Sequence, residues 1–96
     1  MHAVTRFYSG PGARELFDLL AERKDDVEAA MRETKGFVAY TLVATEDGGM
    51  SVTVCKDTDG TEDSLERARE WIEKNAPKLH VSPPAVSEGD VILRLG

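Results

Sequence analysis

The chain has 96 residues and a net charge of −6 at pH 7, with 41% hydrophobic and 31% charged residues. This length and composition indicate one globular domain that spans residues 1–96. The acidic balance argues against nucleic acid and against an anionic membrane surface as partners, because both attract basic proteins. We interpret the negative charge as a source of solubility.

Three features of the sequence predict a cytoplasmic protein. Cys55 is the only cysteine, which excludes an internal disulfide. No apolar run approaches the length of a membrane span, and the N-terminus passes into a strand-like pattern without a secretory signal. A chain without disulfides fits a reducing compartment.

Cysteine and histidine chemistry is not indicated by the sequence. Cys55 lies among apolar residues with no histidine close in sequence to activate it, so we interpret its thiol as a core group and not as a nucleophile. His2 and His80 are the two histidines; they are not paired at helical spacing, and both lie far from Cys55. We therefore expect no metal site.

The first two predicted elements are a strand over residues 2–8 and a helix that begins near Ala13. Residues 9–12 (SGPG) stand where a phosphate-binding loop would, but Pro11 lacks an N–H and no Lys-Ser/Thr pair follows. We interpret this segment as a turn. Residues 22–26 are all polar and interrupt the apolar face of the helix, which predicts a kink, a wide turn or two short helices in series.

A β-hairpin is predicted next, because residues 36–45 and 50–56 are rich in β-branched and aromatic side chains and flank an Asp-Gly-Gly turn. Its first strand is apolar on both faces. One face carries Phe37, Ala39 and Val43, and the other carries Val38, Tyr40, Leu42 and Ala44. A strand with one solvated face would alternate apolar and polar residues, so both faces should be covered. Helices can cover one face, and we expect a second copy of the chain, in a homodimer, to cover the other.

The remaining elements complete a recognisable order. A second helical pattern, capped by Asp59 or Thr61, ends near Asn75. Residues 78–84 predict an extended segment with a rigid turn, and residues 90–95 (DVILRL) predict the last strand. The order β-α-β-β-α-β is typical of the ferredoxin-like α+β fold, in which two helices cover one face of a four-stranded antiparallel sheet.

Trp71 borders the apolar stripe of the second helix. It is either core packing or the wall of a pocket between helix and sheet, with its indole N–H facing a ligand. Four polar residues are the groups that such a pocket would use: Tyr8, Tyr40, Asn75 and His80.

The pattern as a whole resembles a known family. A strand, Gly-Pro-Gly, a long interrupted helix ending in Lys-Gly-Phe37, a hairpin, and Thr-Glu-Asp-Ser-Leu65 leading into a helix with Trp71-Ile72 are similar to the antibiotic-biosynthesis-monooxygenase type of dimeric α/β barrel. The resemblance covers nearly the whole chain. It implies a homodimer whose two sheets close a barrel, with ligands between the sheet and helices of each monomer. Members include cofactor-free monooxygenases of aromatic phenols, haem-degrading enzymes and small proteins without known activity.

The haem-degrading branch of that family uses an asparagine on the first strand, a tryptophan on the second helix and a histidine soon after it. Trp71 and His80 match the last two, whereas Thr5 stands at the first-strand position and Pro77 breaks the helix before His80. The quinone-forming branch surrounds its substrate with tryptophan, asparagine, tyrosine and arginine. The resemblance suggests four residues for these parts: Trp71, Asn75, Tyr40 and Arg6.

Two functional hypotheses follow. The first is an oxidoreductase, a cofactor-free monooxygenase of a small aromatic compound, with His80 or Tyr40 handling a proton. Its substrate-binding residues would be Trp71, Asn75, Arg6 and Tyr8. The alternative is a non-enzymatic dimer that binds a small apolar or aromatic molecule or a partner protein, or a regulatory module of the same topology. An open cleft between sheet and helices favours the first, and a cleft filled by aromatic side chains favours the second.

Overall fold

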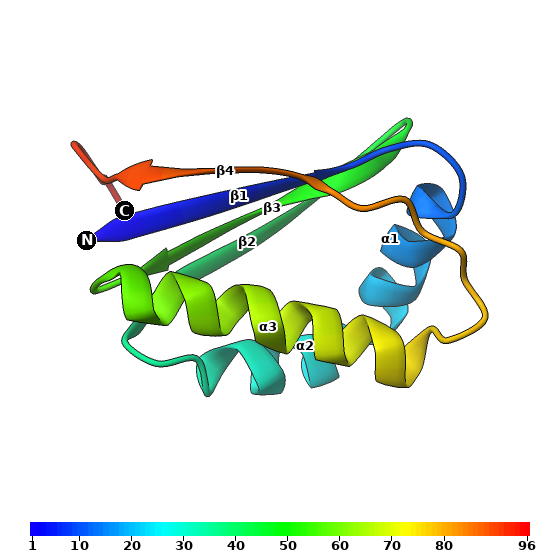
Figure 1. Ribbon diagram of the computed structural model, residues 1–96, viewed down its shortest axis with the longest axis horizontal. Coiled ribbons are helices and arrows are strands. Elements are labelled where there is room, and N and C mark those ends of the chain that lie inside the picture. The colour runs from blue at the N-terminus through cyan, green and yellow to red at the C-terminus, as the bar shows by residue number, and fades with distance from the viewer.

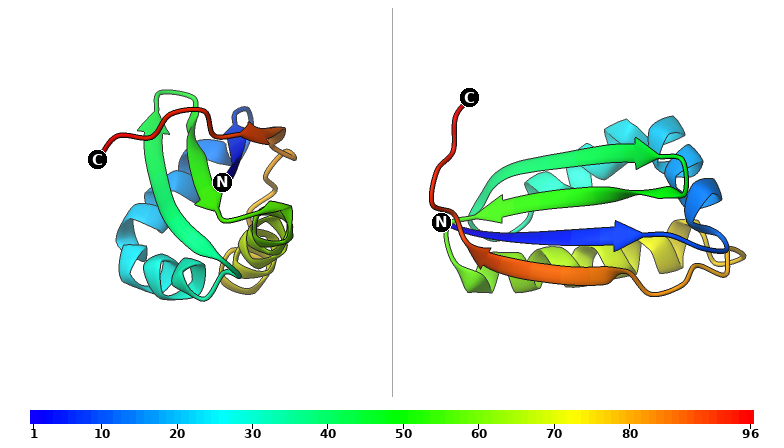
Figure 2. Two further views of the ribbon diagram at one scale, coloured as in Figure 1. Left: turned by 90° about the vertical axis from the view of Figure 1, so that its left-hand side faces the viewer. Right: turned by 90° about the horizontal axis from the view of Figure 1, so that it is seen from above.

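Three helices and four strands make up the fold in the computed structural model, which describes residues 1–96. The elements are, in chain order, β1 (His2–Tyr8), α1 (Ala13–Glu22), α2 (Lys24–Arg32), β2 (Phe37–Thr45), β3 (Gly48–Cys55), α3 (Thr58–Asn75) and β4 (Ala85–Asp90). The strands lie in the order β2-β3-β1-β4, and every neighbouring pair is antiparallel. All the helices cover one face of the sheet, and the other face carries no helix (Figures 1 and 2). The predicted ferredoxin-like α+β fold is confirmed.

None of the helices combines the length and the apolar character of a transmembrane segment. The cytoplasmic location stays a prediction from the sequence.

The helix that the sequence shows as interrupted is divided into α1 and α2. Between Glu22 and Lys24, Arg23 leaves the helical conformation, with φ −109° and ψ 26°. The Arg23 guanidinium then contacts the carboxylate of Asp26 in the first turn of α2 at 2.7 Å. A polar run has no apolar side chain to bury against the sheet, so the chain turns there and both helices keep apolar faces on the core. The prediction of two short helices in series is confirmed.

Two glycines let the β2–β3 hairpin pack closely against β1 and α1. Gly48 has φ +152°, and a Cβ there would lie 2.7 Å from the Cβ of Ala13 and would overlap the carbonyl of Tyr8. A Cβ at Gly49 would overlap the ring of Phe17. Only glycine permits this close approach, which holds the hairpin tip against the start of α1.

A β-bulge changes the face that Phe37 occupies. Phe37 pairs with Cys55, and the register shifts before Ala39, so Val38 is the extra residue. Strand alternation after the bulge places Phe37 on the helix face, where it lines a small hollow with Tyr40 and residues of α2. The prediction that Phe37 shares a face with Ala39 is therefore wrong, because one inserted residue reverses the alternation.

The core lies between the sheet and the helices. Its buried apolar side chains come from β1, α1 and α2, and they are Tyr8, Ala13, Leu16, Phe17, Leu20, Val27 and Met31. The opposite face of the sheet carries an apolar row across three strands, because Phe7 and Val43 both pair with Met50. Phe7 is 49% exposed and Val43 is 41% exposed. The second face of the sheet is thus apolar and uncovered in a single chain, and the homodimer stays a prediction.

The last strand lies earlier in the chain than the sequence predicts. β4 covers Ala85–Asp90, and residues 91–95 of the predicted strand lie outside the sheet. β1 begins at His2, and His2 pairs with Asp90. The residues after Asp90 therefore have no neighbouring strand. Their apolar side chains are exposed, namely Ile92, Leu93 and Leu95. The prediction was wrong because an apolar pattern does not show where the partner strand begins.

The start of α3 also differs from the prediction. Asp57 is its N-cap, in place of Asp59 or Thr61, and the Asp57 carboxylate accepts a hydrogen bond from the N–H of Gly60 at 3.2 Å. An extended residue one position before the helix is the right place for this cap. The predicted end of the helix at Asn75 is confirmed.

Candidate functional site

A small inner cavity lies between the sheet and the helices. Its volume is about 20 Å³, which is little more than one water molecule needs. Apolar side chains of the three helices line it, with Trp71 among them. The sheet adds four polar side chains, those of Arg6, Tyr8, Tyr40 and Ser51. The inner part of the cleft is therefore nearly filled.

A wider groove continues from this cavity to the surface, and Arg6, Tyr8 and Ile72 line both. The groove has a volume of about 410 Å³. Its walls are α3 on one side and residues 81–84 with β4 on the other, and Figure 2 shows β4 lying over α3. An apolar cavity of about 150 Å³ holds a benzene ring, so this groove has room for a larger aromatic molecule. The cleft is open on this side.

Arg6 lies where the cavity meets the groove, and only 3% of its surface is exposed. Its Nε donates to the Oγ of Ser51 at 2.9 Å, and its Nη2 donates to the hydroxyl of Tyr40 at 3.5 Å. Its Nη1 has no hydrogen-bond partner. Arg6 takes part in none of the ion pairs of the structure, so a positive charge is buried without a carboxylate. Such a charge is costly to bury.

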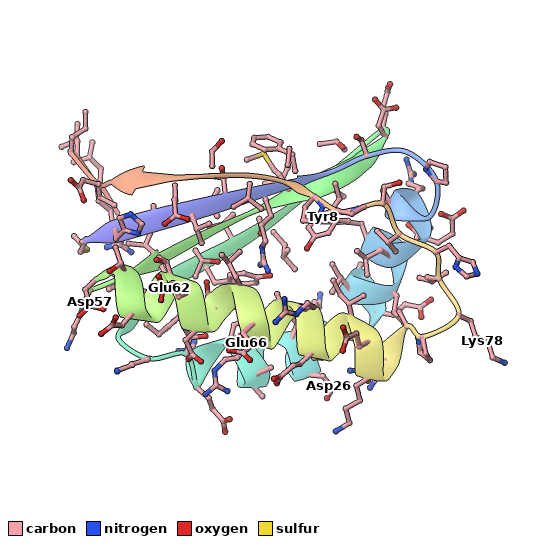
Figure 3. All side chains as sticks on the ribbon, viewed as in Figure 1. Tyr8, Asp26, Asp57, Glu62, Glu66 and Lys78 are labelled. Carbon is pink, nitrogen blue, oxygen red and sulfur yellow. The ribbon has the colours of Figure 1, made fainter.

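Tyr8 and Tyr40 are the ionisable neighbours of Arg6. Burial raises the pKa of both phenols above the usual 10.0, and the positive charge of Arg6 opposes this only in part. Both phenols are therefore neutral near pH 7, and they offer hydrogen bonds but no base. The Tyr8 ring packs against Phe17 with 5.7 Å between ring centroids, and Figure 3 shows Tyr8 on the helix side of the sheet.

Trp71 lines the inner cavity, whereas Asn75, one helical turn later, does not reach it. The Asn75 Nδ2 donates to the carbonyl of Trp71 at 2.9 Å, and its Oδ1 accepts from the Nη2 of Arg23 at 3.2 Å. These bonds hold the amide at the junction of α1 and α2. The structure thus separates Asn75 from the other predicted substrate-binding residues.

His80 is also separated from the cavity. Its side chain is exposed and lines neither cavity nor groove, and its carbonyl passes so close to Gly12 that a Cβ there would lie 2.6 Å from it. Thr5 lies on the opposite face of the sheet, where its Oγ1 donates to the carbonyl of Ser87 at 3.3 Å. The set that the resemblance matched to the haem-degrading branch, Thr5, Trp71 and His80, is therefore not gathered around one cavity, and these residues do not fit a haem.

Three groups of the site were not identified from the sequence. Ser51 orients Arg6, and Arg69 and Glu73 of α3 line the groove. Glu73 is the one carboxylate among the groove residues. Strand alternation indicates from the sequence that Arg6 faces the helices, because it lies on the same face of β1 as Val4 and Tyr8. The contribution of Ser51 depends on the pairing of β1 with β3, in which it stands opposite Arg6.

No group of three or more histidine, cysteine, aspartate or glutamate side chains is arranged to hold a metal ion. Cys55 is buried, and burial raises the pKa of its thiol, with smaller contributions from the carboxylates of Asp57 and Asp63. A buried, protonated thiol agrees with the interpretation of Cys55 as a core group.

No protein-family model and no curated protein matches the sequence. Several solved structures are similar in fold. A protein of unknown function from Nitrosomonas europaea has a TM-score of 0.71 and 18% identity, over 98% of this chain and 90% of that one. A protein described as an antibiotic biosynthesis monooxygenase from Chloroflexus aurantiacus has a TM-score of 0.64 and 14% identity, over 99% and 95%. The monooxygenase of the ActVA-Orf6 gene of Streptomyces coelicolor, solved with nanaomycin D, has a TM-score of 0.56 and 23% identity, over 98% and 91%.

These similarities confirm the resemblance at the level of the fold. The chain has the α+β fold of the antibiotic-biosynthesis-monooxygenase type along nearly its whole length. At such identities a shared fold does not transfer an activity, which has to be argued from the site itself.

Proposed function

We propose that this protein binds a small aromatic compound in the groove between α3 and β4 and oxidises it with molecular oxygen, without a cofactor. The observation that supports this most is the groove of about 410 Å³, which leads to Arg6, Tyr8 and an apolar cavity. An apolar lining with a few convergent polar groups is typical of small-molecule sites. The similar folds of two monooxygenases add support.

Oxidation of a phenol to a quinone balances without an external reductant. The phenol loses four electrons, and these reduce one O₂. One oxygen atom forms a new C=O bond at a ring carbon, and the other leaves as water. That water contains the hydroxyl proton and the hydrogen of the oxidised carbon. The reaction needs a group that takes the phenol proton, together with a site that orients the ring.

We propose a proton acceptor different from His80 and Tyr40, the two residues that the sequence suggests for this role. Tyr40 is a neutral phenol at pH 7, and His80 lies outside the groove. Glu73 is the carboxylate that the groove offers. In this proposal Glu73 takes the proton. The apolar wall of the groove is formed by Leu65, Ile72 and Val81, whereas Trp71 lies in the inner cavity behind it.

The test uses a panel of phenols with one, two and three rings. Binding is read from the fluorescence of Trp71, the only tryptophan, and turnover from oxygen uptake and quinone absorbance. We expect Glu73→Gln to lower kcat by a factor of about 100 or more and to leave KM nearly unchanged. Glu62→Gln, the same change at an exposed position of α3, is the control. Oxygen uptake no higher than in buffer with every phenol would refute the oxidation.

The second candidate is a non-enzymatic dimer that binds a small molecule, as a carrier or a regulatory module. Its support is that neither tyrosine of the cavity can act as a base near pH 7. Quenching of Trp71 fluorescence by a ligand, together with no oxygen uptake for any phenol of the panel, would establish this alternative over the first.

We also propose a homodimer in which the uncovered faces of two sheets meet. The row Phe7–Met50–Val43 is the apolar patch that such an interface would bury. Phe7→Glu should produce monomers in sedimentation experiments, because the interface would have to bury a carboxylate. Ala29→Glu, on the exposed side of α2, should leave the dimer intact. A monomeric wild-type protein would contradict the proposal.

A further inference from the structure

Arg6 carries a positive charge that no group of the protein balances. Its two hydrogen-bond partners, Ser51 and Tyr40, are uncharged hydroxyls. The two N–H donors on its Nη1 have no acceptor, although the side chain is almost fully buried. Substitution of buried ionic groups by apolar residues of similar size often increases the stability of a fold. An unpaired guanidinium at this position is therefore poorly explained by folding and better explained by a ligand.

The elements around Arg6 leave it without a negative neighbour in the interior. The neighbouring strands contribute Tyr40, Ser51 and, on β4, the paired residue Val86. In the groove outside, α3 adds Arg69 and Glu73. Two arginines against one glutamate thus line a groove in a chain whose net charge is −6. The groove is a positive hollow in an acidic protein, and such a hollow attracts anions.

We propose that the ligand of this groove is an aromatic oxyanion, either a carboxylate or the phenolate that forms when Glu73 takes the phenol proton, and that its charged oxygen accepts hydrogen bonds from the Nη1 of Arg6. The ligand would supply both the missing acceptor and the missing negative charge. Bonds between a guanidinium and an oxyanion are shorter and stronger than neutral ones, and burial strengthens them further. A neutral analogue such as an amide can accept a hydrogen bond from Nη1 but leaves the positive charge of Arg6 unbalanced, so it should bind more weakly than the anion. This inference rests on the proposed function, because it takes the groove as the ligand site.

Three naphthalene compounds test the charge requirement. 2-Naphthoate carries a carboxylate, 2-naphthamide has nearly the same shape without charge, and 2,4-dinitro-1-naphthol is a phenolate at pH 7. Binding to the wild-type protein is measured by quenching of Trp71 fluorescence and by calorimetry. We expect at least one anion to bind about tenfold or more tightly than the amide. The comparison of the two anions shows which oxyanion the site prefers.

A substitution then assigns the preference to Arg6. Arg6→Met keeps much of the length of the side chain and removes the charge, so the preference for anions should fall to about onefold while the amide still binds. Arg14→Met, the same change at an exposed position of α1 outside the groove, should keep the full preference.

Each result decides between the inference and the proposed function. Equal binding of amide and anions by the wild-type protein would overturn the inference and leave the groove as a ligand site. A preference that survives Arg6→Met would overturn the assignment to Arg6. Failure of all three compounds to bind would overturn the proposed function and this inference with it. The wild-type comparison requires no variant, so it decides the charge requirement even where Arg6→Met fails to fold.

Discussion

Alkaline titration reports directly on the candidate site, because the chain has two tyrosines and both line the inner cavity. Burial raises the pKa of Tyr8 and of Tyr40, and Arg6 opposes this only in part. In the unfolded chain both phenols ionise near pH 10. Below pH 10 both states keep their protons, and the stability of the fold is fully retained. Above it the unfolded state holds fewer protons than the folded state, so stability falls as pH rises.

The size of this effect follows from proton linkage. Each tyrosine that ionises only in the unfolded state lowers the free energy of unfolding by about 1.4 kcal/mol per pH unit, and two lower it by about 2.8 kcal/mol. Urea unfolding at several pH values between about 8 and 11 measures the slope, and absorbance near 295 nm measures the ionisation. Tyr8→Phe and Tyr40→Phe should each remove about half of the slope, which separates the tyrosines from the lysines that titrate nearby. A native titration midpoint at or below pH 10, or a slope that both variants leave unchanged, would refute the reasoning.

Three further predictions concern stability and reactivity. Gly49→Ala should lower the free energy of unfolding by about 1–3 kcal/mol in urea, because the added methyl group overlaps the aromatic ring it faces on α1, whereas Gly89→Ala, with no atom within 4 Å, should change it little. Cys55 should react with a disulfide reagent only after unfolding, and rapid labelling of the native protein would contradict its burial. The Asp63 pKa is lowered by the hydrogen bond from Arg67 and by a backbone N–H, so its stabilisation is present above pH 4 and lost on further acidification. Asp63→Asn should lower the free energy of unfolding by about 1 kcal/mol at pH 7 and weaken its dependence on pH below pH 4. A loss that is equal at pH 2 and pH 7 would exclude this role.

Much of the fold could be predicted because its signals are local. The Asp-Gly-Gly signal between two runs of strand-forming residues correctly predicts the β2–β3 hairpin, although the turn itself is Glu46-Asp47 and the two glycines already pair with β2. The polar run at residues 22–26 determines the break between α1 and α2. Each signal depends on a few neighbouring residues, whose conformational preferences are the same in many folds. Part of the site is also local, since alternation along β1 places Arg6 and Tyr8 on one face.

The sequence predicted less reliably which side chains near the end of α3 reach the cavity. Asn75 follows Trp71 by one helical turn, yet hydrogen bonds to Trp71 and Arg23 hold its amide away from the cavity. His80 follows the end of α3, where the path of the chain and not a helical period decides the direction of the side chain. Spacing along the sequence placed these residues near Trp71 but could not show which of them face Arg6.

Long-range packing determined the rest. β4 lies at Ala85–Asp90, and not in the more apolar segment that follows, because a strand exists only where a partner can pair with it, and β1 begins at His2. The bulge at Val38, which moves Phe37 to the helix face, is visible only in the register with β3. The unpaired charge of Arg6 depends on every element packed around it. Only the positions of all the neighbouring side chains show that no carboxylate reaches the guanidinium. The local sequence thus sets which elements form, whereas pairing between distant segments sets which groups line the site.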